Sequence, residues 1–377
     1  MTFALTVDAH IFREHLNRIS SNYKLVGAAV VPVVKGNGYG FGRELLIREA
    51  NLLGAAQIAV ANVWELASAL TQTSGQVLVL EPFNPADRLA VGQWELALRA
   101  NADRVIAILS NNVIVEAQNI GIKKILLDGA TSMHRFGMAR HEMANLIRDN
   151  ESKIEIVGLS LHSPIAEPVV THFAALEMTA GINTQSTTNR VLEILAWLAS
   201  YQAMAKENSL PLRASLSHLT SQDIKTIKSA YPDFAIDMRT GTQLWLGCPK
   251  ALHATGDVLA IHEITKSTHV GYRQIESTSN QRLLVVSGGT AHGVALAAPA
   301  DRSTLRKKGI ALAEGINEVR GKVRSPFTRG GDSFIFAEPP HMHVSLLWTN
   351  SLSINVGDKL DCIVRNTTAN FDVVVGL

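Results

Sequence analysis

The amino-acid sequence predicts an α/β protein made of a (β/α)8 barrel, the TIM-barrel fold, followed by a smaller all-β domain. The first observation is that eight short apolar runs alternate with helical patterns over the first 248 of the 377 residues, and eight is the number that a closed barrel needs. The second is that polar side chains suited to chemistry follow directly after several of these runs, as they do at the C-terminal face of such barrels. The third is a change, from about residue 249, to short runs separated by turn residues, which is typical of a β domain. We therefore predict a barrel over residues 1–248 and a β domain over residues 249–377.

The predicted barrel strands are 28–34, 57–62, 76–80, 104–109, 124–127, 154–161, 212–216 and 234–237. The first of them is short and rich in β-branched residues, which suits a strand buried on both faces. The predicted helices repeat apolar residues every three or four positions; they are 10–20, 43–53, 64–70, 86–98, 113–119, 140–148, 189–206 and 221–230. An open doubly wound sheet would also alternate, but it would not naturally stop at eight strands. In the β domain the predicted strands are 258–263, 282–286, 333–336, 343–347 and 359–364, and we assign no structure to the polar stretch 294–331.

Composition limits the classes of function. The chain is 46% hydrophobic with a formal net charge of +2, so its charge gives no reason to expect nucleic acid or membrane partners. Two cysteines, Cys248 and Cys362, are too few for a disulfide framework and lack the spacing of a metal site. We find no secretory leader and no apolar stretch long enough to span a membrane. We therefore expect a cytoplasmic protein.

The most informative stretch is residues 28–42. An apolar run ends at Lys35, and glycines follow at alternate positions, with Tyr39 as the only large polar side chain among them. A lysine packed where a buried strand ends loses solvation, its pKa falls, and its amine becomes available as a nucleophile. Glycines allow positive φ and a close approach of the backbone to a ligand. From this pattern alone, a surface lysine followed by a flexible loop is an equally good interpretation.

The motif Val-Val-Lys-Gly-Asn-Gly-Tyr-Gly-Phe-Gly around Lys35 resembles the pyridoxal-phosphate lysine motif of alanine racemases, usually VVKANAYGHG. The resemblance implies that Lys35 carries pyridoxal 5'-phosphate as a Schiff base and that Tyr39 helps to hold the phosphate. A second segment, which starts at Arg239, resembles the family's RxGIxxYG. It implies that Arg239 faces the pyridine nitrogen, with Gly241 and Thr242 at the phosphate. Because an arginine keeps its proton, it would leave that nitrogen unprotonated, which favours α-proton exchange over elimination.

Three further resemblances extend the cofactor and substrate site. The segment that ends at His162 is similar to the family's GLYTHF, which implies that His162 orients Arg239. Ser217 stands where the family has Asn-Ser, and this resemblance implies that Ser217 contacts the phosphate. Arg135 lies in a segment similar to KxDTGMxRLG, which implies that it binds the substrate carboxylate. The family's carbamylated lysine is replaced by Asp128, whose carboxylate could hold Arg135 by charge matching.

In the predicted β domain, Val270-Gly-Tyr272 resembles the family's VSYG segment, whose tyrosine is the second racemisation base and reaches the active site of the partner subunit. The match implies a homodimer with shared active sites, because a racemase needs bases on both faces of the α-carbon. Met342 resembles the methionine of VxMD, which lines the substrate carboxylate. Two tyrosines of the family are not found: Thr290 replaces the one in GYADG, and we see no INYE segment before Leu377. We expect a wider entrance and a substrate bulkier than alanine.

The sequence thus predicts a pyridoxal-phosphate-dependent amino-acid racemase with Lys35 and Tyr272 as its two bases. One alternative is a metal-assisted lyase or aldolase that acts on D-β-hydroxy amino acids, because His341 and His343 have a spacing that suits adjacent ligands. An exposed pair on a sheet edge is the better interpretation of these histidines, so we predict no metal site. The other alternative is a non-catalytic protein that binds the cofactor.

Overall fold

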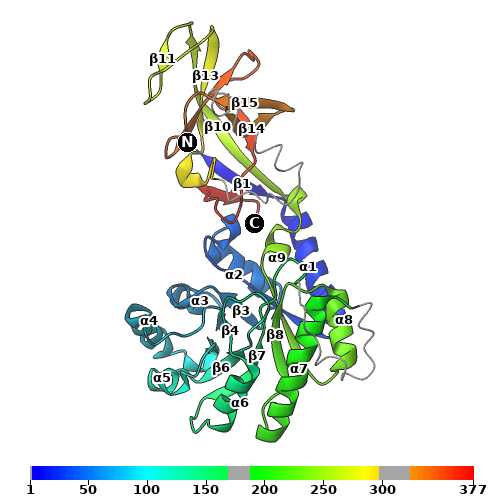
Figure 1. The fold of residues 1–377 in the computed structure, drawn as a ribbon. Helices are drawn as coiled ribbons and strands as arrows, with labels where there is room; N and C mark the ends of the chain where they lie inside the picture. The colour runs from blue at the N-terminus through cyan, green and yellow to red at the C-terminus, as the bar shows by residue number, and fades with distance from the viewer. Residues whose placement is uncertain (1, 169–186, 297–322) are drawn as a thin grey trace. The chain divides into compact units, whose positions relative to one another are not determined.

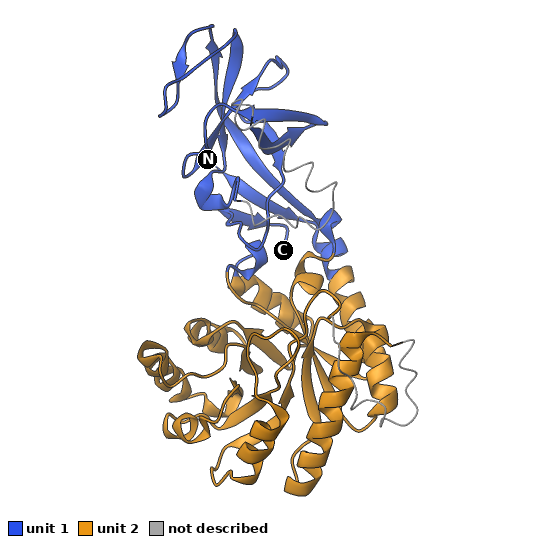
Figure 2. Cartoon of the chain, viewed as in Figure 1, with its two compact units in different colours: residues 1–13, 37–42, 248–377 blue, residues 14–36, 43–247 orange. Residues whose placement is uncertain are grey.

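The fold is that of a computed structural model, and the residues that it describes are 2–168, 187–296 and 323–377. The chain forms two compact units (Figure 2). The barrel unit comprises residues 14–36 and 43–247, and the β unit comprises residues 1–13, 37–42 and 248–377. The glycine-rich loop directly after Lys35 therefore packs with the β unit, although Lys35 itself belongs to the barrel unit.

The barrel unit is built on eight parallel strands: β2 (Ala28–Pro32), β3 (Gln57–Val60), β4 (Gln76–Val79), β5 (Val105–Leu109), β6 (Lys124–Asp128), β7 (Glu155–Ser160), β8 (Arg213–Ser217) and β9 (Ala235–Thr240). They pair in the order β2-β9-β8-β7-β6-β5-β4-β3, and a parallel bridge between Val33 and Ala59 joins the two ends. The interior is filled by small and branched side chains, including Val31, Leu78 and Ile106. The predicted barrel fold is confirmed, and each predicted strand overlaps an observed one.

The helices surround the strands in Figure 1. They are α1 (Ala9–Leu25), α2 (Arg43–Leu52), α3 (Leu66–Gln72), α4 (Arg88–Leu98), α5 (Ile114–Asn119), α6 (Arg140–Arg148), α7 (Asn189–Asn208), α8 (Ser221–Ala230) and the short α9 (Thr242–Leu246). Local sequence explains several starts. Asp87 caps α4 by accepting from the Ala90 N–H at 3.1 Å, and Thr220 with Asp223 forms a capping box at α8. No helix among the described residues is long and apolar enough to cross a membrane.

The β unit is an eight-stranded sheet in the order β13-β16-β15-β14-β17-β10-β1-β18, with a further pairing of β13 and β10. Its strands are β1 (Phe3–Val7), β10 (Leu252–Ile264), β13 (Gln281–Ser287), β14 (Arg324–Arg329), β15 (Asp332–Phe336), β16 (Val344–Thr349), β17 (Lys359–Cys362) and β18 (Val373–Val375). A separate two-stranded ribbon pairs β11 (His269–Val270) with β12 (Ile275–Glu276). The core contains Phe3, Leu284, Phe327 and Leu347, and the predicted all-β domain is confirmed.

Five strands of the β unit were not predicted. β1 and β18, from opposite ends of the chain, pair in parallel with each other, and a pattern of neighbouring residues cannot reveal such a long-range pairing. The ribbon strands β11 and β12 have two residues each, which is too short for a periodicity. The fifth strand, β14, lies in the stretch 294–331, to which the sequence analysis assigned no structure. Residues 297–322 of that stretch lie outside the described residues.

Candidate active site

A cavity of about 230 Å³ opens at the C-terminal ends of the barrel strands. Five of the predicted or discussed residues line it: Lys35, Asp128, Arg135, His162 and Arg239. Lys35 follows β2, His162 follows β7, and Arg239 lies at the end of β9. Asp128 ends β6, and Arg135 lies in the loop after it. The barrel therefore brings together residues that are up to about 200 positions apart, as the sequence predicted for the C-terminal face.

Lys35 leaves the barrel at the end of the β2 segment. The backbone before it is held on both sides, because the Val33 N–H donates to the Thr240 carbonyl at 2.9 Å and the Val34 N–H donates to the Ala59 carbonyl at 2.8 Å. The side chain is exposed to the open cavity, yet the surrounding protein removes part of the water around the amine. This desolvation, with the positive charge of Arg135 as the next cause, lowers the pKa of Lys35. The lowered pKa favours the neutral, nucleophilic amine.

Glu65 fixes the backbone just after Lys35, and the sequence analysis did not single it out. Its buried carboxylate accepts from the Gly36 N–H at 2.7 Å and from the Ala61 N–H at 2.8 Å. It thereby ties the ends of β2 and β3 together, with Arg43 at 3.8 Å. In the sequence, Glu65 reads as an acidic residue at the start of a helix, which is too common a feature to have indicated this role.

Arg239 is a buried arginine at the end of β9. Its Nη1 donates to Ser160 Oγ at 3.1 Å and its Nη2 donates to the Leu161 carbonyl at 2.6 Å. Its Nε, which is also buried, has no hydrogen-bond partner among the residues that the structure describes. Burial lowers the pKa of Arg239 to about 10, and the nearby Asp128 works against that shift. A buried donor without an acceptor is costly, so the free Nε–H is a position where a ligand acceptor would be favourable.

His162 sits at the end of the β7 segment and is neutral. Burial, followed by the charges of Arg239 and Arg135, lowers its pKa to about 2. Its Nδ1 lies 2.9 Å from Ser217 Oγ, so the predicted residues His162 and Ser217 contact each other. The sequence analysis expected His162 to orient Arg239. Among the described residues, the hydrogen bonds that orient the guanidinium come instead from Ser160 and Leu161.

Asp128 is a buried carboxyl in the wall of the same cavity. Burial raises its pKa to about 6, while Arg239, Ser160 and Arg135 lower it to a smaller extent. Arg135 is exposed, with its guanidinium carbon 5.3 Å from the centroid of the Phe136 ring. No ion pair joins Asp128 to Arg135 in the described structure, and the positive charge that acts most strongly on Asp128 is that of Arg239. Arg135 is therefore available to an anionic ligand.

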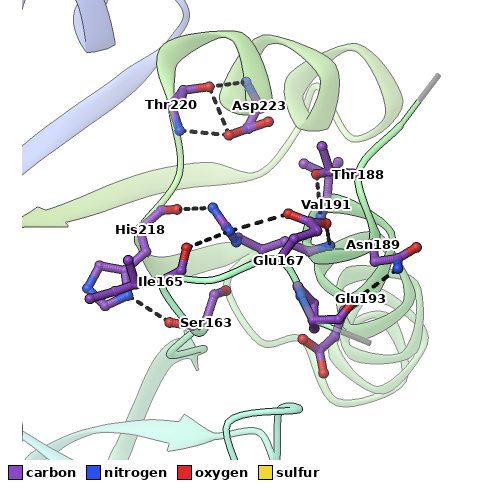
Figure 3. A network of polar contacts seen from close by, with 12 residues as sticks. Ser163, Ile165, Glu167, Thr188, Asn189, Val191, Glu193, His218, Thr220 and Asp223 are labelled. Carbon is purple, nitrogen blue, oxygen red and sulfur yellow. Dashed lines mark hydrogen bonds and ion pairs between the residues drawn. The ribbon is translucent and has the colours of Figure 1, made fainter. Parts of the chain in front are cut away.

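A network around α7 holds the loops that follow β7 and β8 (Figure 3). Arg190 donates from Nη1 to the His218 carbonyl and from Nη2 to the Ile165 carbonyl, each at 2.9 Å, and Glu167 lies 3.3 Å from its Nη2. His218, at a φ of +57°, bonds through Nδ1 to the Ser163 carbonyl at 2.7 Å. These contacts fix the backbone next to Ser217 and His162, and the sequence carried no local signal for Arg190.

The remaining predicted residues are not among those that line the cavity. Gly241 and Thr242 directly follow β9 in the barrel unit, at the start of α9. Tyr39 belongs to the β unit, where it is buried at a φ of +54°. Its loop is held from the end of the chain: the Asn37 amide donates to the carbonyls of Asn366 and Ala369 at 3.0 and 2.6 Å.

Tyr272 and Met342 are also in the β unit and are strongly exposed, at 85% and 66%. His341 and His343 have separate neighbours: His341 contacts Glu338, and the His343 ring lies 5.6 Å from that of His292. Among the described residues, no group of three or more His, Cys, Asp or Glu side chains is arranged to hold a metal ion.

The protein is thus of the class that combines a parallel eight-stranded barrel with a β domain and has a lysine in the barrel cavity. The alanine racemase N-terminal domain family matches residues 7–215. The chain therefore belongs to the alanine racemase family, as the motifs around Lys35 and Arg239 indicated. A search of curated proteins found no match.

Solved structures of alanine racemases share the fold over nearly the whole chain. That from Bacillus anthracis, with bound L-Ala-P, has a TM-score of 0.66 at 16% identity and covers 96% of this chain and 85% of its own. That from Pseudomonas aeruginosa has a TM-score of 0.62 at 18% identity, covering 97% and 91%. That from Bartonella henselae, with covalently bound pyridoxal phosphate, has a TM-score of 0.61 at 16% identity, covering 96% and 90%.

The residues present fit pyridoxal phosphate. The buried Arg239 Nε–H lacks an acceptor, and a pyridine nitrogen is an acceptor of the kind it needs. The same cavity holds the Lys35 amine, which can bind the cofactor covalently, and the neutral His162 beside Ser217.

Proposed function

We propose that the protein is a pyridoxal-phosphate-dependent amino-acid racemase that acts as a homodimer. The observation that carries the proposal is that Lys35, whose pKa is lowered, lines one cavity with Arg239, whose buried Nε–H has no partner among the described residues. When bound, pyridoxal phosphate would supply the electron sink that makes the α-proton of an amino acid acidic. Family membership and the fold support this class of chemistry.

Each residue has a proposed role that follows from its surroundings. Lys35 holds the cofactor and moves the α-proton on one face of the substrate, because its amine can be neutral. Arg239 donates its free Nε–H to the pyridine nitrogen. The phosphate is bound by Ser217, Tyr39 and the backbone at Gly241 and Thr242, with His162 fixed beside it by its contact with Ser217.

The substrate carboxylate is bound by Arg135, which is exposed in the cavity and forms no ion pair with Asp128. Met342 and Tyr272 come from the β unit of a second copy of the chain. Tyr272 moves the α-proton on the face opposite Lys35, so each site needs both subunits. We further propose a substrate bulkier than alanine, because Thr290 stands where the family has a tyrosine.

The test is a panel of single-enantiomer amino acids incubated in deuterium oxide with the cofactor-loaded protein, with α-proton loss and chirality both measured. Exchange with inversion for at least one substrate is the expected result, and comparison of alanine with larger side chains tests the substrate proposal. Absence of inversion across the panel would refute the racemase. Borohydride reduction followed by peptide mapping should place the cofactor on Lys35. K35R should lose that attachment, while K123A, which changes an exposed lysine of the same unit, should keep it.

A further inference from the structure

The most exposed aromatic side chain among the described residues is Tyr272, at 85%. It lies in the turn that joins β11 to β12, and the pair Val270↔Ile275 closes this turn. The ribbon is anchored to the sheet because Val270, just before the turn, is buried in one cluster with Leu283 and Leu346. An exposed tyrosine at the tip of a two-residue ribbon would ordinarily be poorly oriented, since such a ribbon has little stability of its own.

A carboxylate beneath the turn fixes it. Glu338 is buried, and its Oε1 accepts from the Tyr272 N–H at 2.9 Å while its Oε2 accepts from the Arg273 N–H at 3.0 Å. Gly271, at a φ of +73°, lies so close that an added Cβ would come within 2.1 Å of Glu338 Oε1. The turn therefore depends both on the carboxylate and on a residue without a side chain.

The same carboxylate also orients a ring beside the tyrosine. His341 Nε2 donates to Glu338 Oε1 at 2.5 Å, and the His341 ring centroid lies 4.3 Å from that of Tyr272. The His341 backbone is held in turn, because its N–H donates to the Val344 carbonyl and its own carbonyl accepts from the Thr290 N–H, both at 2.9 Å. Burial alone would raise the pKa of Glu338, but the bonds from Arg273, His341 and Tyr272 outweigh it and the pKa is lowered, so the acceptor stays ionised.

Building on the proposed function, we infer that Glu338 and His341 are positioning residues that fix the phenol of Tyr272 for its role as the second base. In one direction of the reaction the Tyr272 phenolate oxygen takes the α-proton, and in the other the phenol returns a proton to the α-carbon. Neither Glu338 nor His341 exchanges a proton with the substrate. Their contribution is geometric, and misplacement of a reacting group by about 1 Å can reduce a rate by on the order of 100-fold.

The positioning can be measured without catalysis. The chain has five tyrosines, so fluorotyrosine labelling gives a simple fluorine NMR spectrum in which Y272F identifies the Tyr272 signal. In E338Q the amide offers one acceptor where the carboxylate offered two, so one N–H of the turn loses its partner. We expect E338Q and H341A each to shift the Tyr272 signal and leave the other four in place. E263Q changes an exposed glutamate of β10 in the same unit and should move none. An unmoved Tyr272 signal in both E338Q and H341A would overturn the inference.

The catalytic consequence is specific to one face. With cofactor-loaded protein in deuterium oxide, E338Q should slow α-proton exchange of one enantiomer about tenfold or more while the exchange at the Lys35 face changes by less than about twofold. A merely structural role would slow both alike, and that outcome would overturn the inference. In a Y272F background E338Q should have no further effect. If the wild-type protein exchanges neither enantiomer, the proposed function fails, and the fluorine spectra still decide whether Glu338 and His341 hold Tyr272.

Discussion

Replacement of Asp128 by asparagine is expected to stabilise the folded protein at neutral and higher pH, although most substitutions of buried residues destabilise. Asp128 is 7% exposed, and burial raises its pKa from 3.8 to about 6. Because the folded state holds the proton more tightly than the unfolded state, the contribution of Asp128 to stability is fully present below pH 3.8. It is lost as the pH rises through about 6.

The size of the effect follows from that shift. A difference of about two pKa units corresponds to about 3 kcal/mol, and about 1.4 kcal/mol of this is lost between pH 5 and pH 8. An asparagine keeps the shape of the side chain and its ability to bond Ser160 but carries no charge at any pH. D128N should therefore exceed the wild type in free energy of unfolding by about 3 kcal/mol at pH 8 and by about 1.4 kcal/mol less at pH 5.

The assay is denaturant unfolding of the barrel unit at several pH values from 5 to 8, followed by the fluorescence of its tryptophans. D233N, which changes an exposed aspartate of the same unit, controls for the loss of one negative charge. Two results would contradict the expectation: a D128N protein that is less stable than the wild type at pH 8, or a difference in their free energies of unfolding that does not grow between pH 5 and pH 8. Either result would show that burial does not penalise the ionised form of Asp128. The reasoning about the cavity would then be wrong.

Three further predictions concern the scaffold. T220A removes the hydroxyl that caps α8 by accepting from the Asp223 N–H at 3.1 Å, so it should lower the free energy of unfolding by about 1 kcal/mol, whereas T226A, on the exposed side of the same helix, serves as a control. R190A leaves the Ile165 and His218 carbonyls without their donor and should cost about 1–3 kcal/mol. E167Q keeps an oxygen that can accept from the Arg190 N–H and removes only the charge of a partly exposed ion pair, so it should cost less than about 1 kcal/mol; equal losses would contradict the role given to the two carbonyls. Burial raises the pKa of the Cys362 thiol to about 12, so at pH 8 a disulfide reagent should label it only after denaturant is added, and rapid labelling of native protein would disprove its burial.

The barrel could be predicted because its strands are buried on both faces. Several of them read as apolar runs, such as Val105–Leu109, where all five residues are buried. The position of the lysine was also a local feature, because Lys35 is the first polar residue after such a run. The predicted domain boundary between residues 248 and 249 stays a prediction. The compact units do not follow a single cut in the chain, because residues 1–13 and 37–42 pack with the β unit.

The partners of the site residues could not be predicted in the same way. Arg239 is oriented by Ser160 and Leu161, about 80 positions earlier in the chain, and nothing in either segment specifies the other. Glu338 lies 66 positions after Tyr272, and it falls in a stretch whose sequence indicated only a methionine contact and a possible metal pair. Motifs report which groups are present, whereas hydrogen-bond partners depend on how strands far apart in sequence are brought together.

The charges in the barrel cavity argue for a ligand rather than a structural ion-pair network. Burial shifts the pKa of Lys35, Asp128, His162 and Arg239 in the direction that disfavours the charged form of each. In a network that serves stability, the partners shift one another the opposite way, as Arg148 and Asp149 do on the surface. The cavity therefore concentrates a cost in stability that the attraction between Asp128 and Arg239 offsets only in part, and Arg239 Nε, which has no partner among the described residues, adds to it. A ligand that brings an acceptor for that donor and negative charge for the cations would offset the cost on binding, which is the behaviour expected of a site kept for function.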